Sequence, residues 1–163
     1  MTHVRLGNVL AGAGNVAAAE SVFTEAVRKR PAYAAAQADL GNLLHTQRRD
    51  DEALPWFRRA AELAPAFVID VSNLGAAYFR LNRWDEAEAA FLRAVALEAD
   101  PYSYQHLGAI YFYRQRYLDA AAGYETFLAQ RPDHPRSLLA LYQAGLCYER
   151  LDRAGDAVDR WEA

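Results

Sequence analysis

Residues 40–65 read LGNLLHTQRRDDEALPWFRRAAELAP, and the same pattern has already occurred once, in residues 6–31. The shared features are a Leu-Gly pair followed by Ala, Phe, Ala and Pro, and each recurs at an offset of 34 residues. In the later stretch these features are Leu40-Gly41, Ala53, Phe57, Ala60 and Pro65. Self-similarity at one fixed period indicates an array of repeated structural units, each of which packs mainly on its neighbours.

The pattern continues along the rest of the sequence. A third copy contains Leu74-Gly75, Tyr78, Ala87, Phe91 and Ala94, a fourth contains Leu107-Gly108, Tyr111, Ala120, Tyr124 and Pro132, and a partial fifth contains Gly145, Tyr148, Ala157 and Trp161. The step from Gly75 to Gly108 is 33 residues, and the step from Gly108 to Gly145 is 37. We therefore interpret residues 1–163 as a single array with repeats at about 1–33, 34–67, 68–100, 101–134 and 138–163, the last incomplete.

Each repeat has the pattern of two amphipathic helices joined by a short polar turn. In the third repeat, apolar residues at helical spacing predict a first helix over 69–81, and a second helix is predicted over 84–97. The markers and their spacing resemble the tetratricopeptide repeat (TPR) family over essentially the whole chain. This resemblance implies an all-α fold, a right-handed superhelical α-solenoid of antiparallel helix pairs. It also implies that the marker glycines lie where a side chain would collide with the partner helix, and that large aromatic residues fill the core: Phe23, Phe57, Phe91, Tyr124 and Trp161.

The composition excludes several classes of protein. The formal net charge is −3, so the chain has no bulk attraction to nucleic acid or to an anionic membrane surface. No apolar run approaches the ~20 residues of a membrane-spanning helix. Cys147 is the single cysteine, which excludes an internal disulfide and favours a small packed apolar residue. The sequence does not determine the subcellular localisation. The cytoplasm is favoured, and a periplasmic location is an alternative if a targeting segment is missing. The bias of its basic residues to arginine suggests a bacterial source.

Catalysis and cofactor binding are not predicted. Gly12 to Ala17 spell the GxGxxA pattern of dinucleotide sites, but no strand is predicted before them, and the repeat register places them in a turn between helices. The four histidines fall in separate repeats or links, without metal-ligand spacing. Acidic residues at the starts of second helices, such as Asp50 and Glu86, are expected to interact with the helix dipole. We therefore expect no cofactor, no metal and no enzymatic activity.

The first helices carry the candidate binding surface, because in TPR proteins they line the concave groove. Polar residues lie two positions before each marker glycine: Arg5, Asp39, Asn73, His106 and Gln143. In family members that bind extended peptides, an asparagine at this place commonly binds the ligand backbone, and Asn73 matches it. Asn8 and Asn42 directly follow their glycines and are expected to face the same groove. The alternative is that these residues are only solvated, with Arg5 and Asp39 paired.

Aromatic residues are concentrated in the later first helices. We expect Phe79, Tyr102, Phe112, Tyr113 and Tyr142 to face the groove, where exposed rings would anchor a peptide or helix. The alternative is that two of them pack on adjacent repeats. The predicted partner-binding set is therefore Asn8, Asn42, Asn73, Phe79, Tyr102, His106, Phe112 and Tyr113.

The family also includes co-chaperones that hold an acidic C-terminal tail in a clamp of basic residues and asparagines. Asn8 matches one clamp position if repeats one to three are aligned, and Asn42 and Asn73 match both asparagines if repeats two to four are. The basic positions instead hold Val4, Ile69 and Asn73 in the first alignment, and Ala38, Tyr102 and His106 in the second. Without fixed positive charge a tail carboxylate would lose its strongest partners, which disfavours this function.

The sequence thus predicts a non-catalytic scaffold that binds a peptide segment or helix of a partner protein in its concave groove. Two alternatives stay open: a substrate-recruiting arm of a larger enzyme, such as a glycosyltransferase or a sulfotransferase, and a self-assembling structural module. We also expect the apolar faces of Leu141, Ala144, Tyr148 and Trp161 to lack cover, so that either the natural protein continues past Ala163 or the C-terminal end associates with another molecule.

Overall fold

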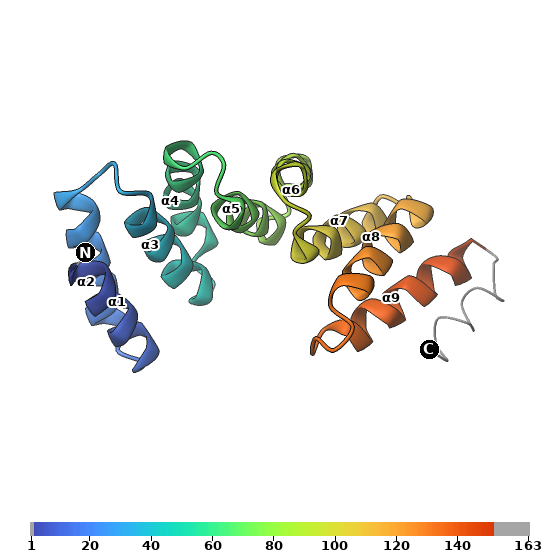
Figure 1. The fold of residues 1–163 in the computed structure, drawn as a ribbon, viewed down its shortest axis with the longest axis horizontal. Coiled ribbons are helices and arrows are strands. Elements are labelled where there is room, and N and C mark those ends of the chain that lie inside the picture. Colours follow the sequence, from blue (N-terminus) through green and yellow to red (C-terminus); the bar gives the residue numbers. More distant parts are fainter. Residues whose placement is uncertain (1, 152–163) are drawn as a thin grey trace. The chain divides into compact units, whose positions relative to one another are not determined.

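The structure, a computed structural model, describes residues 2–151, and this part of the chain is helical throughout, without a strand. Short turns connect the helices, and successive helices within a pair run antiparallel (Figure 1). The helices are α1 (Thr2–Gly12), α2 (Val16–Lys29), α3 (Ala34–Thr46), α4 (Asp50–Leu63), α5 (Val68–Arg80), α6 (Trp84–Leu97), α7 (Pro101–Tyr113), α8 (Tyr117–Gln130) and α9 (Ser137–Arg150). The predicted fold class, an all-α solenoid of antiparallel helix pairs, is confirmed, and α5 and α6 differ from their predicted ranges by at most one residue.

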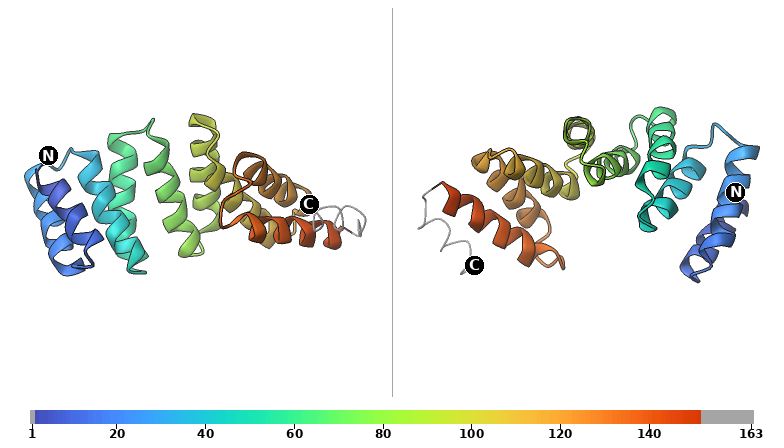
Figure 2. Two further views of the ribbon diagram at one scale, coloured as in Figure 1. Left: turned by 60° about the horizontal axis from the view of Figure 1, so that its bottom comes forward. Right: turned by 180° about the vertical axis from the view of Figure 1, so that it is seen from behind.

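The chain forms two compact units, residues 1–90 and residues 91–163, with the boundary inside α6. In the first unit the helices stack in chain order, and the first helices of successive repeats contact one another, α1 with α3 and α3 with α5 (Figure 2). In the second unit α8 packs against both α7 and α9. The helix pairs fall within the predicted repeat ranges, and the interpretation of the whole chain as one array stays a prediction.

The predicted core residues that the structure describes are buried, and Trp161 lies outside the described residues. Phe23, Phe57, Phe91 and Tyr124 are each at most 1% exposed. The aromatic rings explain the marker glycines, because a Cβ atom added to Gly41 would lie 2.8 Å from the ring of Phe57. A Cβ atom on Gly7 would meet Phe23, and one on Gly108 would meet Tyr124, in the same way. These glycines let the paired helices approach closely, as the family resemblance implied.

The turn between the two helices of a repeat has the same backbone conformation in four repeats. The residue seven positions after the marker glycine has a left-handed conformation, with φ of 78° at Gly14, 63° at Arg48, 57° at Asn82 and 59° at Gln115. Only the first of these residues is glycine, so the other three turns hold a side chain in a region that L-residues adopt at a cost of about 1 kcal/mol or more. The helices that the turns connect therefore determine the turn geometry.

The GxGxxA stretch lies in the first of these turns. Gly12 is the last residue of α1, and Asn15 caps α2 by accepting a hydrogen bond from the Ala18 N–H at 3.4 Å. A helix precedes the glycines where a dinucleotide site needs a strand. The prediction that they form a helix–helix turn is confirmed.

The structure also bears on the predictions for Cys147 and for membrane-spanning helices. Cys147 lies within α9 and is 0% exposed, as predicted for a packed small residue. Burial, together with the charge of Glu125, raises the pKa of its thiol to about 11. Within residues 2–151, no helix is long and apolar enough to cross a membrane.

Candidate binding surface on the first helices

Each predicted asparagine of the first unit takes part in a hydrogen bond between successive first helices. The Asn8 side-chain amide donates to the Asp39 carboxylate at 3.4 Å, which connects α1 to α3. The Asn73 amide donates to the Asn42 side-chain oxygen at 3.1 Å, which connects α5 to α3. The structure therefore places these side chains in one row on the first helices, and Asp39 pairs with Asn8 where the sequence suggested Arg5.

A cavity of about 380 Å³ lies beside this row, between α3 and α5. Its opening includes two large apolar side chains, Phe67 and Ile69, which are 53% and 55% exposed. Its polar lining comes from Asp39, Asn42 and Asp70. The remaining lining residues are Tyr33, Ala34, Ala35, Ala38 and Ala64. The site thus combines exposed apolar area with hydrogen-bonding groups, as ligand sites in proteins usually do.

The cavity is acidic. Asp70 is only 3% exposed, and burial, reinforced by the nearby Asp39 charge, raises the pKa of its carboxyl to about 6. Burial also raises the pKa of Asp39, although the hydrogen bond from Asn8 opposes this shift. Sequence reasoning included Asp39 among the polar groove residues and missed Asp70. The signal was available, because the corresponding positions of other repeats hold small residues: Ala36, Ser103 and Ala140.

Phe79 and Phe112 are half-buried, and each packs on the first aromatic residue of the helix that follows. The Phe79 and Trp84 rings meet edge to face at 5.1 Å, and the Phe112 and Tyr117 rings do so at 5.5 Å. Phe112 also packs against the buried cluster around Tyr124. The predicted anchors at these two positions therefore contribute part of their surface to their own helix pair.

The second repeat replaces this aromatic pair by a histidine and an aspartate. His45 and Asp50 occupy the repeat positions of Phe79 and Trp84, and His45 Nδ1 lies within hydrogen-bonding distance of the Asp50 carboxylate. The Arg80 guanidinium binds the same carboxylate at 2.9 Å and donates to the His45 carbonyl oxygen at 2.8 Å. The expectation that Asp50 serves chiefly the helix dipole was therefore incomplete, because its buried carboxylate also holds a cation from the next repeat.

In the second unit, the predicted residues differ in accessibility. The His106 ring stacks on Phe91 at 4.8 Å, so it contributes to packing. Tyr102 is 36% exposed and contacts His134, whose ring centroid lies 5.5 Å away. Tyr113 is 69% exposed, which makes it the most accessible of the predicted aromatic anchors.

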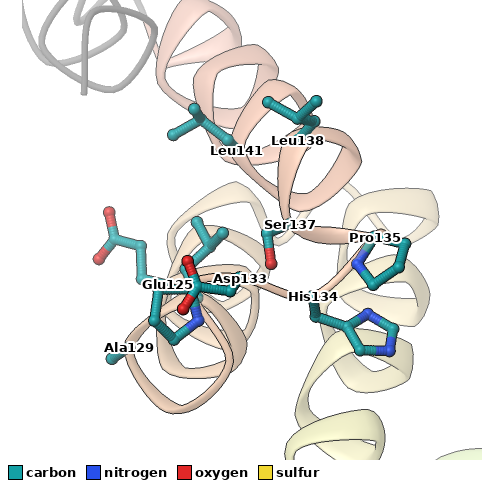
Figure 3. Close-up of a pocket in the computed structure, with 10 residues that line it drawn as sticks. Glu125, Ala129, Asp133, His134, Pro135, Ser137, Leu138 and Leu141 are labelled. Carbon is teal, nitrogen blue, oxygen red and sulfur yellow. The ribbon is translucent and has the colours of Figure 1, made fainter.

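A second cavity, of about 700 Å³, lies in the second unit where α8 is linked to α9 (Figure 3). Leu138 and Leu141 reach it from α9, His134 and Pro135 come from the link, and Glu125 comes from α8. Leu138 is 81% exposed. No residue of this link was predicted from the sequence to form a site.

The prediction of an uncovered apolar face on α9 was wrong for two of its residues. Ala144 is 0% exposed because α9 packs on α8. Tyr148 is half-buried, and its hydroxyl donates to the Glu125 carboxylate at 2.7 Å. Leu141 is also half-buried and lines the cavity described above, and Trp161 lies outside the described residues. The more exposed apolar side chains of α9 are Leu138, Leu139 and Tyr142.

Comparison with known proteins agrees with this geometry. The sequence profile of the tetratricopeptide repeat matches residues 4–66 and 107–163, and a second profile of the same repeat matches residues 71–100. The chain belongs to the tetratricopeptide repeat family. Most TPR domains are non-catalytic scaffolds, and this chain has their fold. Within the part of the TPR chain that the structure describes, no group of three or more His, Cys, Asp or Glu residues could hold a metal ion.

A curated relative of this TPR chain is anaphase-promoting complex subunit 6 of Arabidopsis thaliana, which is 28% identical over 117 residues. The match covers 71% of the chain and only 22% of that subunit, so the chain spans about a fifth of the length of this relative.

Solved structures show the same TPR fold. MamA superimposes with a TM-score of 0.89 at 20% identity, over 99% of this chain and 87% of MamA. YrrB, described as a TPR protein with an unusual peptide-binding site, gives 0.81 at 20% identity, over 98% of this chain and 81% of YrrB. The APC/C hetero-tetramer Cut9–Hcn1 gives 0.79 at 19% identity, over 98% of this chain and 32% of the matched chain. Identities this low establish the fold alone.

Proposed function

We propose that this TPR chain is a non-catalytic interaction scaffold that binds a peptide segment or helix of a partner protein on its first helices. The observation that carries the proposal is the cavity between α3 and α5, where exposed apolar side chains adjoin a row of side-chain amides. An extended polypeptide needs both, because its backbone requires hydrogen-bond partners while its apolar side chains supply most of the affinity. The fold supports this proposal, because it is shared with YrrB, described as having a peptide-binding site, and with a chain of the Cut9–Hcn1 hetero-tetramer.

The binding residues of the first unit follow from the cavity. Asn8 would exchange its hydrogen bond to Asp39 for a bond to the ligand backbone, and Asn42 and Asn73 would do the same with the hydrogen bond between them. Ile69 and Phe67 would bury apolar side chains of the ligand. Phe79 would contribute with the part of its ring that Trp84 leaves accessible. In the second unit, Tyr102 and Tyr113 are proposed anchors, with His106 and Phe112 supporting them from half-buried positions.

The test is capture of partner proteins from the source cell, quantified by mass spectrometry. We expect Asn73→Ala and Ile69→Ser each to reduce the proteins captured by the full chain by about tenfold or more, a loss typical of a binding hot spot. Leu92→Ser is the matched control, because Leu92 is a similarly exposed aliphatic residue on a second helix. Equal capture by the wild type, Asn73→Ala and Ile69→Ser, with unchanged helicity by circular dichroism, would place the binding site elsewhere.

A related experiment concerns the chaperone-tail clamp. A synthetic peptide that ends in acidic residues and a free carboxylate is expected to bind no better than its amidated form. The cavity supports this expectation, because Asp39 and Asp70 would repel a tail carboxylate. A clear preference for the free acid would contradict it.

A further inference from the structure

The Asp70 side chain is largely buried, and its carboxylate has no partner among residues 2–151. It lies in the first turn of α5 and is 3% exposed, yet it makes no hydrogen bond or ion pair with any of residues 2–151. The same residue lines the cavity between α3 and α5. A buried carboxylate in folded proteins is normally paired or hydrogen-bonded, because loss of water around an unpaired charge destabilises the fold.

The repeat pattern shows that the fold does not require a carboxylate here. The corresponding residues are Ala36, Ser103 and Ala140, and each is 0% exposed. The backbone therefore packs equally well around a small side chain at this position. A charged group that the fold does not need, at the wall of a cavity, indicates a ligand that would neutralise it.

The surroundings specify the charge of that ligand. Asp39, from α3, is the second carboxylate of the cavity, and the two charges disfavour each other. The other lining residues are neutral, and within residues 2–151 no hydrogen bond or ion pair joins either carboxylate to a basic side chain. Within residues 2–151, the Asp39 side chain hydrogen-bonds to the Asn8 amide alone, which carries no charge. The cavity is thus a small anionic site with apolar walls.

We propose that the cavity between α3 and α5 binds the side chain of an arginine or lysine presented by the partner polypeptide, with Asp39 and Asp70 as its anionic contacts. This inference rests on the proposed function, since it names the side chain that the same groove recognises. The aliphatic stem of either residue would lie along Ile69 and Phe67 at the opening, while the cationic group reaches the two carboxylates. Such charge-assisted hydrogen bonds in a partly desolvated site are stronger than bonds between neutral groups.

The experiment selects peptides from a random dodecapeptide library displayed on phage, against the immobilised full chain. Parallel selections use Asp39→Asn, Asp70→Asn and Asp70→Ala, the last of which copies the residue found at 36 and 140. The control is Asp51→Asn, which removes an exposed carboxylate from the start of α4. Circular dichroism and thermal unfolding of each variant confirm that it is folded.

We expect arginine or lysine to be enriched at one fixed position of the peptides selected by the wild type and by Asp51→Asn, and this enrichment to disappear with Asp70→Asn and Asp70→Ala. For a selected peptide, replacing that basic residue by glutamine should weaken binding to the wild type by about tenfold or more, and much less to Asp70→Asn. Asp39→Asn should produce an intermediate loss, because Asp70, the more deeply buried of the two carboxylates, is left.

The outcomes separate the two proposals. Peptides without a fixed basic residue that lose binding with Ile69→Ser or Asn73→Ala would overturn the basic-side-chain inference and leave the proposed function standing. Failure to enrich any peptide that depends on these first-helix residues would overturn both. Binding that requires added Ca²⁺ or Mg²⁺ would show that the carboxylates hold a metal ion, and would equally overturn the inference.

Discussion

Arg80 Nη2 lies 2.9 Å from Asp50 Oδ2, and this contact joins the end of α5 to the start of α4. The Asp50 side chain is only 8% exposed, and His45 approaches the same carboxylate. The pair therefore links the second and third repeats by a largely desolvated charge interaction, in a place where the third and fourth repeats use aromatic rings.

Removal of one partner of this pair is expected to be costly. Arg80→Met or Asp50→Asn should each lower the free energy of unfolding by about 3 kcal/mol, because the remaining group loses its oppositely charged partner in a largely desolvated place. The double variant Arg80→Met with Asp50→Leu should recover most of this loss, since neither charge is then buried. Urea unfolding followed by circular dichroism measures the effect, and Arg59→Met, on the exposed face of α4, is the control. Near-neutral single variants would show that the pair is solvated.

Asp70 is expected to make stability fall as the pH rises. Its folded pKa of about 6 exceeds the value of about 3.9 for an unfolded chain, so between these values the folded state binds more protons. The wild type should therefore lose up to about 3 kcal/mol relative to Asp70→Ala as the pH rises from about 4 to about 7. Asp39 adds to the effect while it is charged. The measurement is urea unfolding of both proteins across this range, and a constant difference between them would contradict the shifted pKa.

Two glycines of the first turn should respond to alanine in opposite directions. A Cβ atom would meet nothing within 4 Å at either Gly12 or Gly14, so only the backbone differs. Gly14→Ala should lower the free energy of unfolding by about 1 kcal/mol, because φ at this residue is 78°. Gly12→Ala, at the end of α1, should raise it by up to about 1 kcal/mol. Thermal unfolding of both variants tests the difference, and equal effects would rule out the left-handed conformation at Gly14.

Cys147 is expected to be unreactive in the folded protein. With a pKa of about 11, its thiolate fraction at pH 8 is smaller than that of a free cysteine by about a hundredfold or more, and the side chain is buried. A chromogenic disulfide reagent should therefore react far more slowly in buffer than in denaturant. Comparable rates in the two solutions would show that α9 opens readily from α8.

The fold could be predicted because each marker has one packing role. Phe57 and Gly41 illustrate this, since the ring fills the space that the missing side chain leaves, and both recur at a fixed period. The packing role of Gly123 was not predicted, because this glycine does not recur in the other repeats. A Cβ atom there would lie 2.8 Å from the Tyr104 carbonyl oxygen, but the glycine occurs in one repeat only, so no periodicity exposes its role.

The candidate site was harder to predict because it depends on departures from the repeat. The row of Asn8, Asn42 and Asn73 was found from register, which places residues on a face. The repeat register alone does not predict the hydrogen-bond or ion-pair partner of a side chain. Asp39 binds Asn8, and Asp50 binds Arg80. A direct comparison of equivalent positions would have singled out Asp50 and Asp70, since both are acids where other repeats hold aromatic or small residues.

The position of Asp70 has a consequence for how such an array can diversify. The main chain around residues 36, 70, 103 and 140 is built by the surrounding helices, whichever side chain stands there. A single amino-acid substitution at one of these positions would then add or remove a charge without changing the fold. Repeats with the same backbone thus offer several equivalent positions at which such a charge could be introduced or removed while the fold is kept.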